Sequence, residues 1–247
     1  MFDDVVAFQS FYRTRQGSSI RSILAPRTDG FWQRGPDACN AALGFGTPFL
    51  RPTSGGFALM PQRHGAVAWP SSVATRSLLI DPHCLPFQDV QLDRLLIVHA
   101  LEFDTNPADL LAEAWRALDG SGRLMVIVPH RLGLWARAEQ TPFGHGRPFS
   151  RRQLRDIMVT AGFEVTRMST ALFTPPSARG WSLQIAPTIE RIGQRWMKPL
   201  GGVLIAEANK LLYAPAGNTS KLRTKEGLKS PRLVPQSGRA FHSMETR

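Results

Sequence analysis

Two glycines separated by a single residue, Gly44 and Gly46, follow a short apolar run near the front of the chain. Glycine pairs in such loops allow a backbone to approach a nucleotide-type cofactor, because no side chain blocks the approach. Thr47 and Pro48 come next and suit the start of a short helix, but Pro48 stands where a third glycine would be expected. The stretch predicts an incomplete cofactor loop, with an ordinary pair of turn glycines as the alternative.

Two histidines are candidates for acid–base chemistry. His99 lies near the end of the apolar segment 92–101, with Glu102 three residues later, and His145 lies in a long connection over residues 129–150. A histidine so placed can accept a proton from a reacting group. His99 is equally well explained as a structural core residue, and Glu102 as the cap of a turn. We take His99 and His145 as the candidate catalytic residues.

The long connection has the composition of a substrate-facing loop. It combines His145 and Arg147 with two aromatic neighbours, Phe143 and Phe149. Such a combination suits an anionic or aromatic acceptor, and connections of this length are often binding loops. We predict that Trp135, His145 and Arg147 contact the substrate, with an ordinary surface loop anchored by aromatic residues as the alternative.

An N-terminal helical segment is predicted to cover the site. Residues 5–24 have helical character, interrupted around Gly17. Tyr12 and Arg13 lie on this segment, and we predict that they also contact the substrate. A plain position on the helix is the alternative.

Metal chemistry and two hydrolytic classes are disfavoured. No credible set of metal ligands is formed by His64, His83, His130, Cys39 and Cys84. The sequence contains neither a G-x-S-x-G elbow nor a phosphate-binding P-loop, which argues against α/β-hydrolase and NTPase chemistry. We predict no metal site.

The elements that must position these residues alternate between strand and helix, the pattern of a mostly parallel α/β sheet. Helices are expected at 5–24, 106–118 and 150–163. Strands are expected at 38–45, 75–80, 92–101, 123–129, 164–173 and 201–214, with one or two more at 56–60 and 65–69. The last two strands in the chain are expected to pair antiparallel, and 119–122 to form a turn.

Two of the helices carry clear start signals. Asn106 and Pro107 suit the N-cap and first position of one helix. Ser150 and Gln153 form a capping box at the start of the other, which stops at Gly162. These signals fix the two most securely predicted helices of the chain.

Composition and charge narrow the class of protein. The chain has 247 residues, 43% of them hydrophobic, and six tryptophans, which indicates a folded body. Its net charge is +11, of which a surplus of five positive charges lies after residue 216. We predict a basic, flexible tail over 216–247. Nucleic acid or an acidic protein is an alternative partner for this tail, and a solvated tail without a dedicated ligand is favoured.

The location is predicted to be cytoplasmic. The first ten residues carry two acids and no basic residue, unlike a signal peptide, and no apolar run approaches the roughly 20 residues of a membrane helix. The spacing of Cys39 and Cys84 suits a reducing compartment.

The segment 81–131, continued by 149–165, resembles the class I S-adenosylmethionine-dependent methyltransferases. Within that family it is most similar to the small-molecule enzymes typified by ubiquinone and menaquinone biosynthesis. The likeness covers about residues 38–215 and is strongest in Asp81, Leu85-Pro86-Phe87, Asp89 and Leu92-Asp93-Arg94. It implies a Rossmann-like, seven-stranded, mostly parallel sheet with flanking helices and an antiparallel strand near the C-terminus.

The resemblance also implies a set of residues that bind S-adenosylmethionine. The set comprises Gly44, Gly46, Thr47, Asp81, Leu85, Phe87 and His99. The glycine loop would lie beside the methionine part of the cofactor, and Asp81 near the adenine amino group.

Two acids that the family normally uses are missing. Ala42 stands where an acid usually helps to hold the ammonium group, and no acid follows the strand expected at 56–60. The loss of one such charge-assisted hydrogen bond removes roughly 1.5–3 kcal/mol of binding. The loop is therefore a degenerate form of the family's motif.

The sequence predicts a methyltransferase acting on a small molecule, with three parts: 1–37 covering the site, a methyltransferase-like domain at 38–215, and the tail at 216–247. The first alternative is a non-catalytic protein of the same fold that binds a protein or regulatory partner. The second is an RNA methyltransferase, suggested by the charge.

Overall fold

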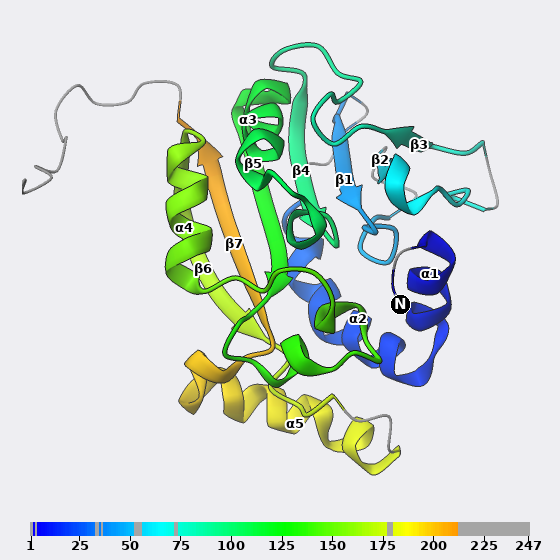
Figure 1. Cartoon of the computed structure of the whole chain (residues 1–247), viewed down its shortest axis with the longest axis vertical. Helices are drawn as coiled ribbons and strands as arrows, with labels where there is room; N and C mark the ends of the chain where they lie inside the picture. The colour runs from blue at the N-terminus through cyan, green and yellow to red at the C-terminus, as the bar shows by residue number, and fades with distance from the viewer. Residues whose placement is uncertain are drawn as a thin grey trace, which may run out of the picture. The chain divides into compact units, whose positions relative to one another are not determined.

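The computed structural model describes residues 2, 4–32, 35, 37–51, 56–71, 74–176 and 180–211. Its centre is a seven-stranded sheet in the order β3-β2-β1-β4-β5-β7-β6 (Figure 1). The strands are β1 (Asn40–Gly44), β2 (Phe57–Pro61), β3 (Ser77–Ile80), β4 (Leu92–Val98), β5 (Leu118–Pro129), β6 (Phe163–Ala171) and β7 (Val203–Lys210). The pairs among β1 to β5 are parallel, whereas β7 is antiparallel to both β5 and β6. The predicted fold class is confirmed.

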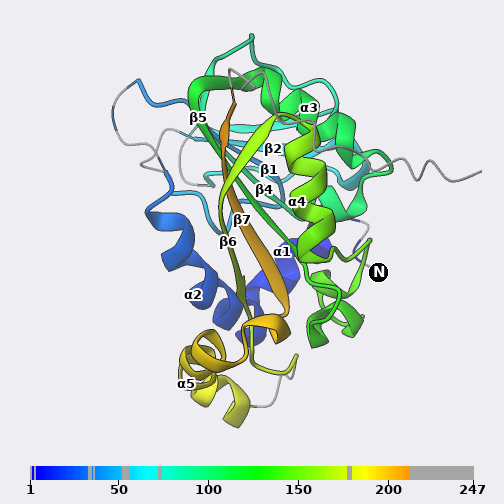
Figure 2. The same ribbon diagram turned by 90° about the vertical axis from the view of Figure 1, so that its left-hand side faces the viewer.

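Helices cover both faces of the sheet. The α-helices are α1 (Val5–Arg13), α2 (Arg15–Asp29), α3 (Pro107–Ala117), α4 (Arg151–Thr160) and α5 (Gly180–Trp196). The 3-10 helices are η2 (Gln62–His64), η3 (Leu101–Phe103), η4 (Leu134–Arg137), η5 (Pro142–Gly144) and η6 (Lys198–Leu200). Figure 2 shows β6 and β7 running between α2 and α4, with α5 beyond one end of the sheet.

The alternation of side chains along β4 explains why both faces need a cover. Leu95 and Ile97 pack in the apolar cluster that contains residues of α3 and α4. Leu96 and Val98 pack in the opposite cluster, with residues of α1 and α2. A strand buried on both faces reads as a continuous apolar run, which is the pattern of this segment.

The break in the N-terminal helix lies at Thr14, three residues before the predicted interruption at Gly17. The hydroxyl of Thr14 accepts a hydrogen bond from the Gly17 N–H at 3.0 Å and caps α2. A side chain on Gly17 would place its Cβ 2.2 Å from the Phe11 carbonyl oxygen. Gly17 is therefore needed for the close approach of the two helices, and the interruption itself comes from the cap.

Three further local expectations need correction. Residues 65–69 form no strand, because Gly65 turns the chain with φ +80°. Residues 119–122 are a bulge within β5 opposite Asp93, not a turn that precedes the strand. Thr47 and Pro48 lie in a turn without starting a helix.

The two helix starts agree with prediction, with one difference. Ser150 and Gln153 form the capping box of α4. Asn106 is the N-cap of α3, but its side chain donates to the Asp109 carboxylate and accepts no backbone N–H. The predicted tail, 216–247, lies outside the described residues, and within the described part no helix is both long and apolar enough to cross a membrane.

Candidate functional site

Helix α1 packs against the loop that leaves the carboxyl end of β1 (Figure 1). Phe8 and Tyr12, one turn apart on α1, both stack on Phe45, the residue between the two glycines. The ring centroids are 5.5 Å apart for Phe8 and 5.7 Å for Tyr12, with interplanar angles of 21° and 25°. These three side chains are buried, so aromatic packing closes the carboxyl end of β1.

The two glycines allow close packing inside this region. Gly44 has φ +91°, and a Cβ there would lie 2.1 Å from the Val98 carbonyl oxygen and 2.9 Å from that of His99. A Cβ on Gly46 would lie 2.4 Å from the Ala42 side chain. Gly44 thus allows the end of β1 to pack against the end of β4. A side chain at either glycine would collide with neighbouring atoms of the protein, so the loop conformation requires both glycines.

A buried triad lies at the end of β4. Tyr12 Oη lies 2.8 Å from His99 Nε2, a hydrogen-bonding distance, and His99 Nδ1 lies 3.3 Å from a Glu102 carboxylate oxygen. The side chains of His99 and Glu102 are completely buried. Neither His99 Nδ1 nor either carboxylate oxygen of Glu102 has a hydrogen-bond partner among the described residues.

The triad stores unfavourable energy. His99 adopts φ +54°, a left-handed conformation that non-glycine residues rarely adopt and that costs of order 1–3 kcal/mol. A buried carboxylate without hydrogen bonds is also costly. Burial raises the pKa of Tyr12 well above its usual value, and the nearby charge of Glu102 raises it further, so Tyr12 keeps its proton. Strain and buried charge of this kind cluster at functional sites.

The connection between β5 and α4 closes over the triad. The ring of Phe143 lies 4.8 Å from that of His99. The Arg147 N–H donates to the Glu102 carbonyl at 2.7 Å, and Gly146, with φ +74°, packs directly on Glu102. Phe143 in turn contacts Trp135, which is buried and donates its indole N–H to a backbone carbonyl. The loop therefore forms one wall of the site.

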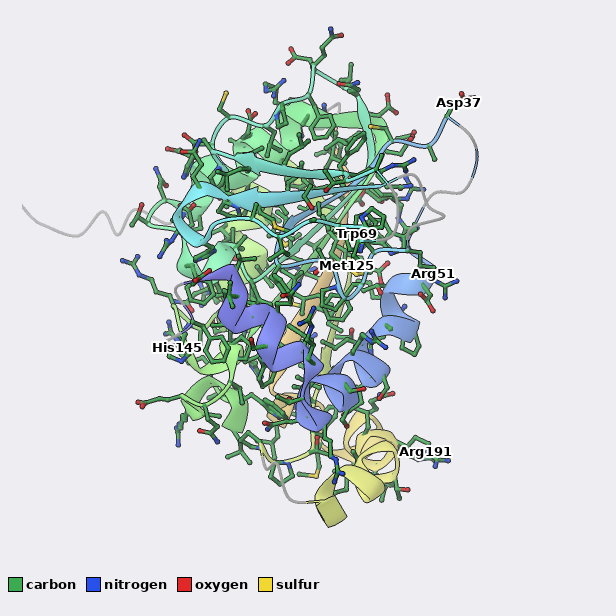
Figure 3. All side chains as sticks on the ribbon, turned by 90° about the vertical axis from the view of Figure 1, so that its right-hand side faces the viewer. Asp37, Arg51, Trp69, Met125, His145 and Arg191 are labelled. Carbon is green, nitrogen blue, oxygen red and sulfur yellow. The ribbon has the colours of Figure 1, made fainter. Side chains whose placement is uncertain are left out.

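The polar side chains of this wall point elsewhere. His145 Nε2 lies 2.6 Å from the Glu139 carbonyl oxygen, and its ring packs against Phe2. Figure 3 shows His145 at the surface beside the start of α1. Arg147 and Arg13 are exposed. The structure brings Tyr12, His99 and Trp135 into one buried region and leaves His145, Arg147 and Arg13 at its outer edge.

Asp81, Leu85 and Phe87 lie in the segment that follows β3. The exposed Asp81 carboxylate accepts the His83 N–H at 2.9 Å, within its own turn. Leu85 belongs to the apolar cluster on the α3 side of the sheet, and Phe87 packs against it. Their backbone is held by α3, where Arg116 donates to both carbonyls.

The residues at the end of β1 fit S-adenosylmethionine in chemistry but not in volume. Glu102 offers a buried negative charge to a positively charged ligand. The space beside Gly44 is a cavity of about 10 Å³, lined in part by Val5, Phe8 and Phe45, and a ligand pocket usually has about 300–1,000 Å³. Position 42 is a buried alanine, and it offers no acid to hold the ammonium group. The cofactor does not fit unless α1 moves.

Phe8 and Phe45 are the residues that sequence reasoning missed. Phe8 precedes Tyr12 by four residues, the spacing that puts two side chains on one helix face. Phe45 lies between the two glycines. Both positions could have been noticed, but filling of the site depends on tertiary packing. Within the described residues, no cluster of three or more His, Cys, Asp or Glu side chains could hold a metal ion.

No family model and no curated protein matches the sequence. Solved structures do match in fold. One is an S-adenosylmethionine-dependent methyltransferase of Thermotoga maritima, described as a possible histamine N-methyltransferase. It is 21% identical, with a TM-score of 0.59, and the match covers 83% of this chain and 95% of that chain.

Two other matches illustrate the range of the fold. Geranyl diphosphate C-methyltransferase of Streptomyces coelicolor A3(2), solved with S-adenosylhomocysteine, is 17% identical with a TM-score of 0.52, covering 76% of this chain and 75% of that chain. The [4+2]-cyclase SpnF is 17% identical with a TM-score of 0.53, covering 77% and 80%. The chain therefore has the fold of the S-adenosylmethionine-dependent methyltransferases.

Proposed function

We propose that this chain is an S-adenosylmethionine-dependent methyltransferase that acts on a small-molecule acceptor. The observation that carries the proposal is the buried triad of Tyr12, His99 and Glu102 beside Gly44. Open α/β sheets bind their ligands at the carboxyl ends of the strands, where this triad lies. A structure of the same fold with S-adenosylhomocysteine bound supports the choice of cofactor.

In this proposal His99 is the general base. A carboxylate beside an imidazole stabilises the positive ring that forms when the imidazole takes up a proton, and Glu102 stands 3.3 Å from Nδ1. Nε2 lies at hydrogen-bonding distance from Tyr12. It therefore becomes available to an acceptor only when α1 withdraws Tyr12. When bound, the cofactor would supply a methyl group on a positively charged sulfur, and the Glu102 carboxylate would favour that charge.

Opening of α1 is an essential part of the proposal. The side chains of Val5 and Phe8 line the 10 Å³ cavity where a ligand would need to lie. A protein whose binding-competent state is only partly populated binds its ligand more weakly by that fraction. We expect the remaining assigned residues to complete the open site, with Gly46, Thr47, Asp81, Leu85 and Phe87 toward the cofactor and Arg13, Trp135, His145 and Arg147 toward the acceptor.

Calorimetric titration with S-adenosylhomocysteine tests the proposal. We expect micromolar binding by the wild type, and at least tenfold weaker binding by Glu102→Gln, because one charge-assisted interaction is lost. Asp81→Ala is expected to weaken binding as well. Phe8→Ala is expected to bind more tightly than the wild type, because it reduces the packing that holds α1 in place. Glu139→Gln, an exposed acid with the same charge change, is the control.

A non-catalytic binding role is the second candidate. The filled cavity and the missing acids, at Ala42 and after β2, favour it. This candidate expects no heat of binding from the wild type or from Phe8→Ala at millimolar S-adenosylhomocysteine. That result would contradict the methyltransferase proposal, since Phe8→Ala removes the obstruction.

A further inference from the structure

A second region of the molecule combines hollows with positive charge. Three adjoining cavities of about 420, 360 and 510 Å³ lie around β6. Arg167 of β6 lines all three, Arg27 lines the first two, and Arg151 lines the last two. We call this continuous surface the arginine strip; its six arginines are Arg27, Arg123, Arg151, Arg152, Arg155 and Arg167.

The strip follows the free edge of the sheet. β6 is the last strand, separated from β4 and its triad by β7 and β5. Figure 2 shows this edge between α2 and α4, the two helices that contribute Arg27 and Arg151. Arg27 donates to the Thr170 carbonyl and Arg151 to the Met168 carbonyl, at 3.3 and 3.0 Å. Because these edge carbonyls are occupied, a peptide cannot pair with them by adding a strand.

Positive charge exceeds negative charge along the strip. Glu190 pairs with Arg27, Glu207 contacts Arg123 and Arg167, and Asp156 pairs with Arg152. Six arginines therefore share three carboxylates. Burial lowers the pKa of Arg27; Glu190 opposes this effect and the charge of Arg167 adds to it, so the two guanidinium groups repel each other.

We infer that the arginine strip binds the phosphate backbone of a nucleic acid. Guanidinium groups match phosphate oxygens with two parallel hydrogen bonds, and the strip uses arginine as its only cation. Its shared cavities form a continuous track, which suits an extended chain of charges better than one isolated phosphate. Among the described residues that line the cavities, Phe31 is the only aromatic one, so the contacts lie with the backbone and carry little sequence information.

Protection of the edge strand explains only part of this arrangement. Arg27 and Arg151 satisfy the edge carbonyls and would suffice for that task. Arg152 and Arg155 are exposed on α4 and extend the positive surface beyond the edge. The inference does not depend on the proposed methyltransferase activity, because no residue of the triad lines the cavities of the strip.

Fluorescence anisotropy with a labelled 20-nucleotide oligouridylate and the full chain tests the inference. The strip variant carries Arg151→Gln, Arg155→Gln and Arg167→Gln, three exposed residues whose loss should leave the fold intact. We expect the strip variant to bind the oligouridylate at least tenfold more weakly than the wild type at 100 mM salt. We also expect the slope of the logarithm of the binding constant against the logarithm of the salt concentration to be smaller by about two.

Two matched variants separate the strip from net charge and from the tail. Arg15→Gln, Arg21→Gln and Arg76→Gln remove three exposed arginines outside the strip. Lys221→Gln, Lys225→Gln and Lys229→Gln remove three charges between 216 and 247. We expect both variants to change binding less than threefold. Equal weakening in either one, or an unchanged strip variant, would overturn the inference.

Competition identifies the ligand chemistry. We expect unlabelled oligouridylate to displace the probe at micromolar concentration. Polyglutamate of the same charge should displace the probe only at concentrations at least tenfold higher, and the same is expected of uridine monophosphate. Competition by polyglutamate at the concentration of the RNA would assign the strip to an acidic protein instead. Competition by the mononucleotide at micromolar concentration would assign it to a small phosphorylated ligand.

Discussion

The triad at the end of β4 and the arginine strip around β6 both contain charged groups, but the triad is shielded from solvent and the strip is exposed to it. Glu102 and His99 are completely enclosed, and the cavity beside the neighbouring Gly44 measures about 10 Å³. The strip borders hollows of several hundred Å³, and Arg151, Arg155 and Arg167 are exposed. Solvated charges cost little, whereas a buried unpaired charge is expensive. Substitutions in the triad region should therefore change folding, and those of the exposed strip arginines Arg151, Arg155 and Arg167 should change mainly binding.

The largest effect is expected for Gly44→Ala. Its φ of +91° disfavours any side chain, and the new Cβ would lie 2.1 Å from the Val98 carbonyl oxygen. We expect the free energy of unfolding to fall by about 4 kcal/mol, measured by denaturant unfolding. Gly30→Ala is the control, because Gly30 has φ −81° and nothing within 4 Å of a built Cβ. Equal losses in the two variants would contradict the close packing described.

Phe8→Ala should destabilise the closed region by a smaller amount. Phe8 is 1% exposed, and its removal leaves a cavity at the end of β1. We expect a loss of about 3 kcal/mol in the free energy of unfolding. Val6→Ala, on the exposed face of the same helix, should change stability by less than about 0.5 kcal/mol. A similar small change for Phe8→Ala would mean that α1 is not packed as described.

Glu102→Gln should stabilise the fold while weakening the site. It keeps the shape of the side chain and removes a buried charge whose oxygens lack hydrogen bonds. We expect the free energy of unfolding to rise by about 1–2 kcal/mol, with Glu139→Gln unchanged as a control. A loss of stability in Glu102→Gln would show that its interaction with His99 is net stabilising.

The smallest predicted effect concerns pH and His130, which follows β5 and lies near Arg151 of the strip. Burial lowers its pKa, the Gly201 carbonyl opposes this, and Arg151 of the strip adds to the lowering. Because the folded-state pKa is lower than the unfolded value, the unfolded chain takes up the proton first. Stability due to this group is present above about pH 6.5 and is lost as the pH falls through that value toward the folded-state pKa.

The test compares the wild type with His130→Asn by denaturant unfolding at pH 7 and pH 5. Asparagine can still donate to the Gly201 carbonyl, which His130 Nδ1 faces at 2.9 Å, but it has no proton to gain. We expect the wild type to lose up to about 1 kcal/mol more than the variant between the two pH values. Equal losses would remove His130 as a source of acid sensitivity.

The fold was predictable where local signals were strong. Ser150 and Gln153 determine the start of α4, and the apolar run of β4 can only be a strand buried on both faces. Helix α5 was missed: Pro187 interrupts its sequence, and no cap precedes it with a clear signal. The short segment 65–69 was misjudged because its alternation of small and apolar residues resembles a strand.

Some residues of the candidate site could be predicted from the sequence, but the volume of its cavity could not. Tyr12 and His99 could be named because each lies on an element expected near the end of the sheet. That Phe8 packs on both Phe45 and His99 depends on the angle between α1 and α2, which Gly17 and Thr14 set together. Such an angle is a property of packing and leaves no periodic signal in the sequence.

The contact between Tyr12 and His99 joins residues 87 positions apart, and this spacing has a consequence for biosynthesis. During translation α1 leaves the ribosome before β4 and the 141–147 loop, so its apolar side chains meet these partners only after both segments have been made. A nascent chain must therefore carry an exposed aromatic helix for several seconds, at about 5–20 residues per second. We expect α1 to be accessible to molecular chaperones during this interval.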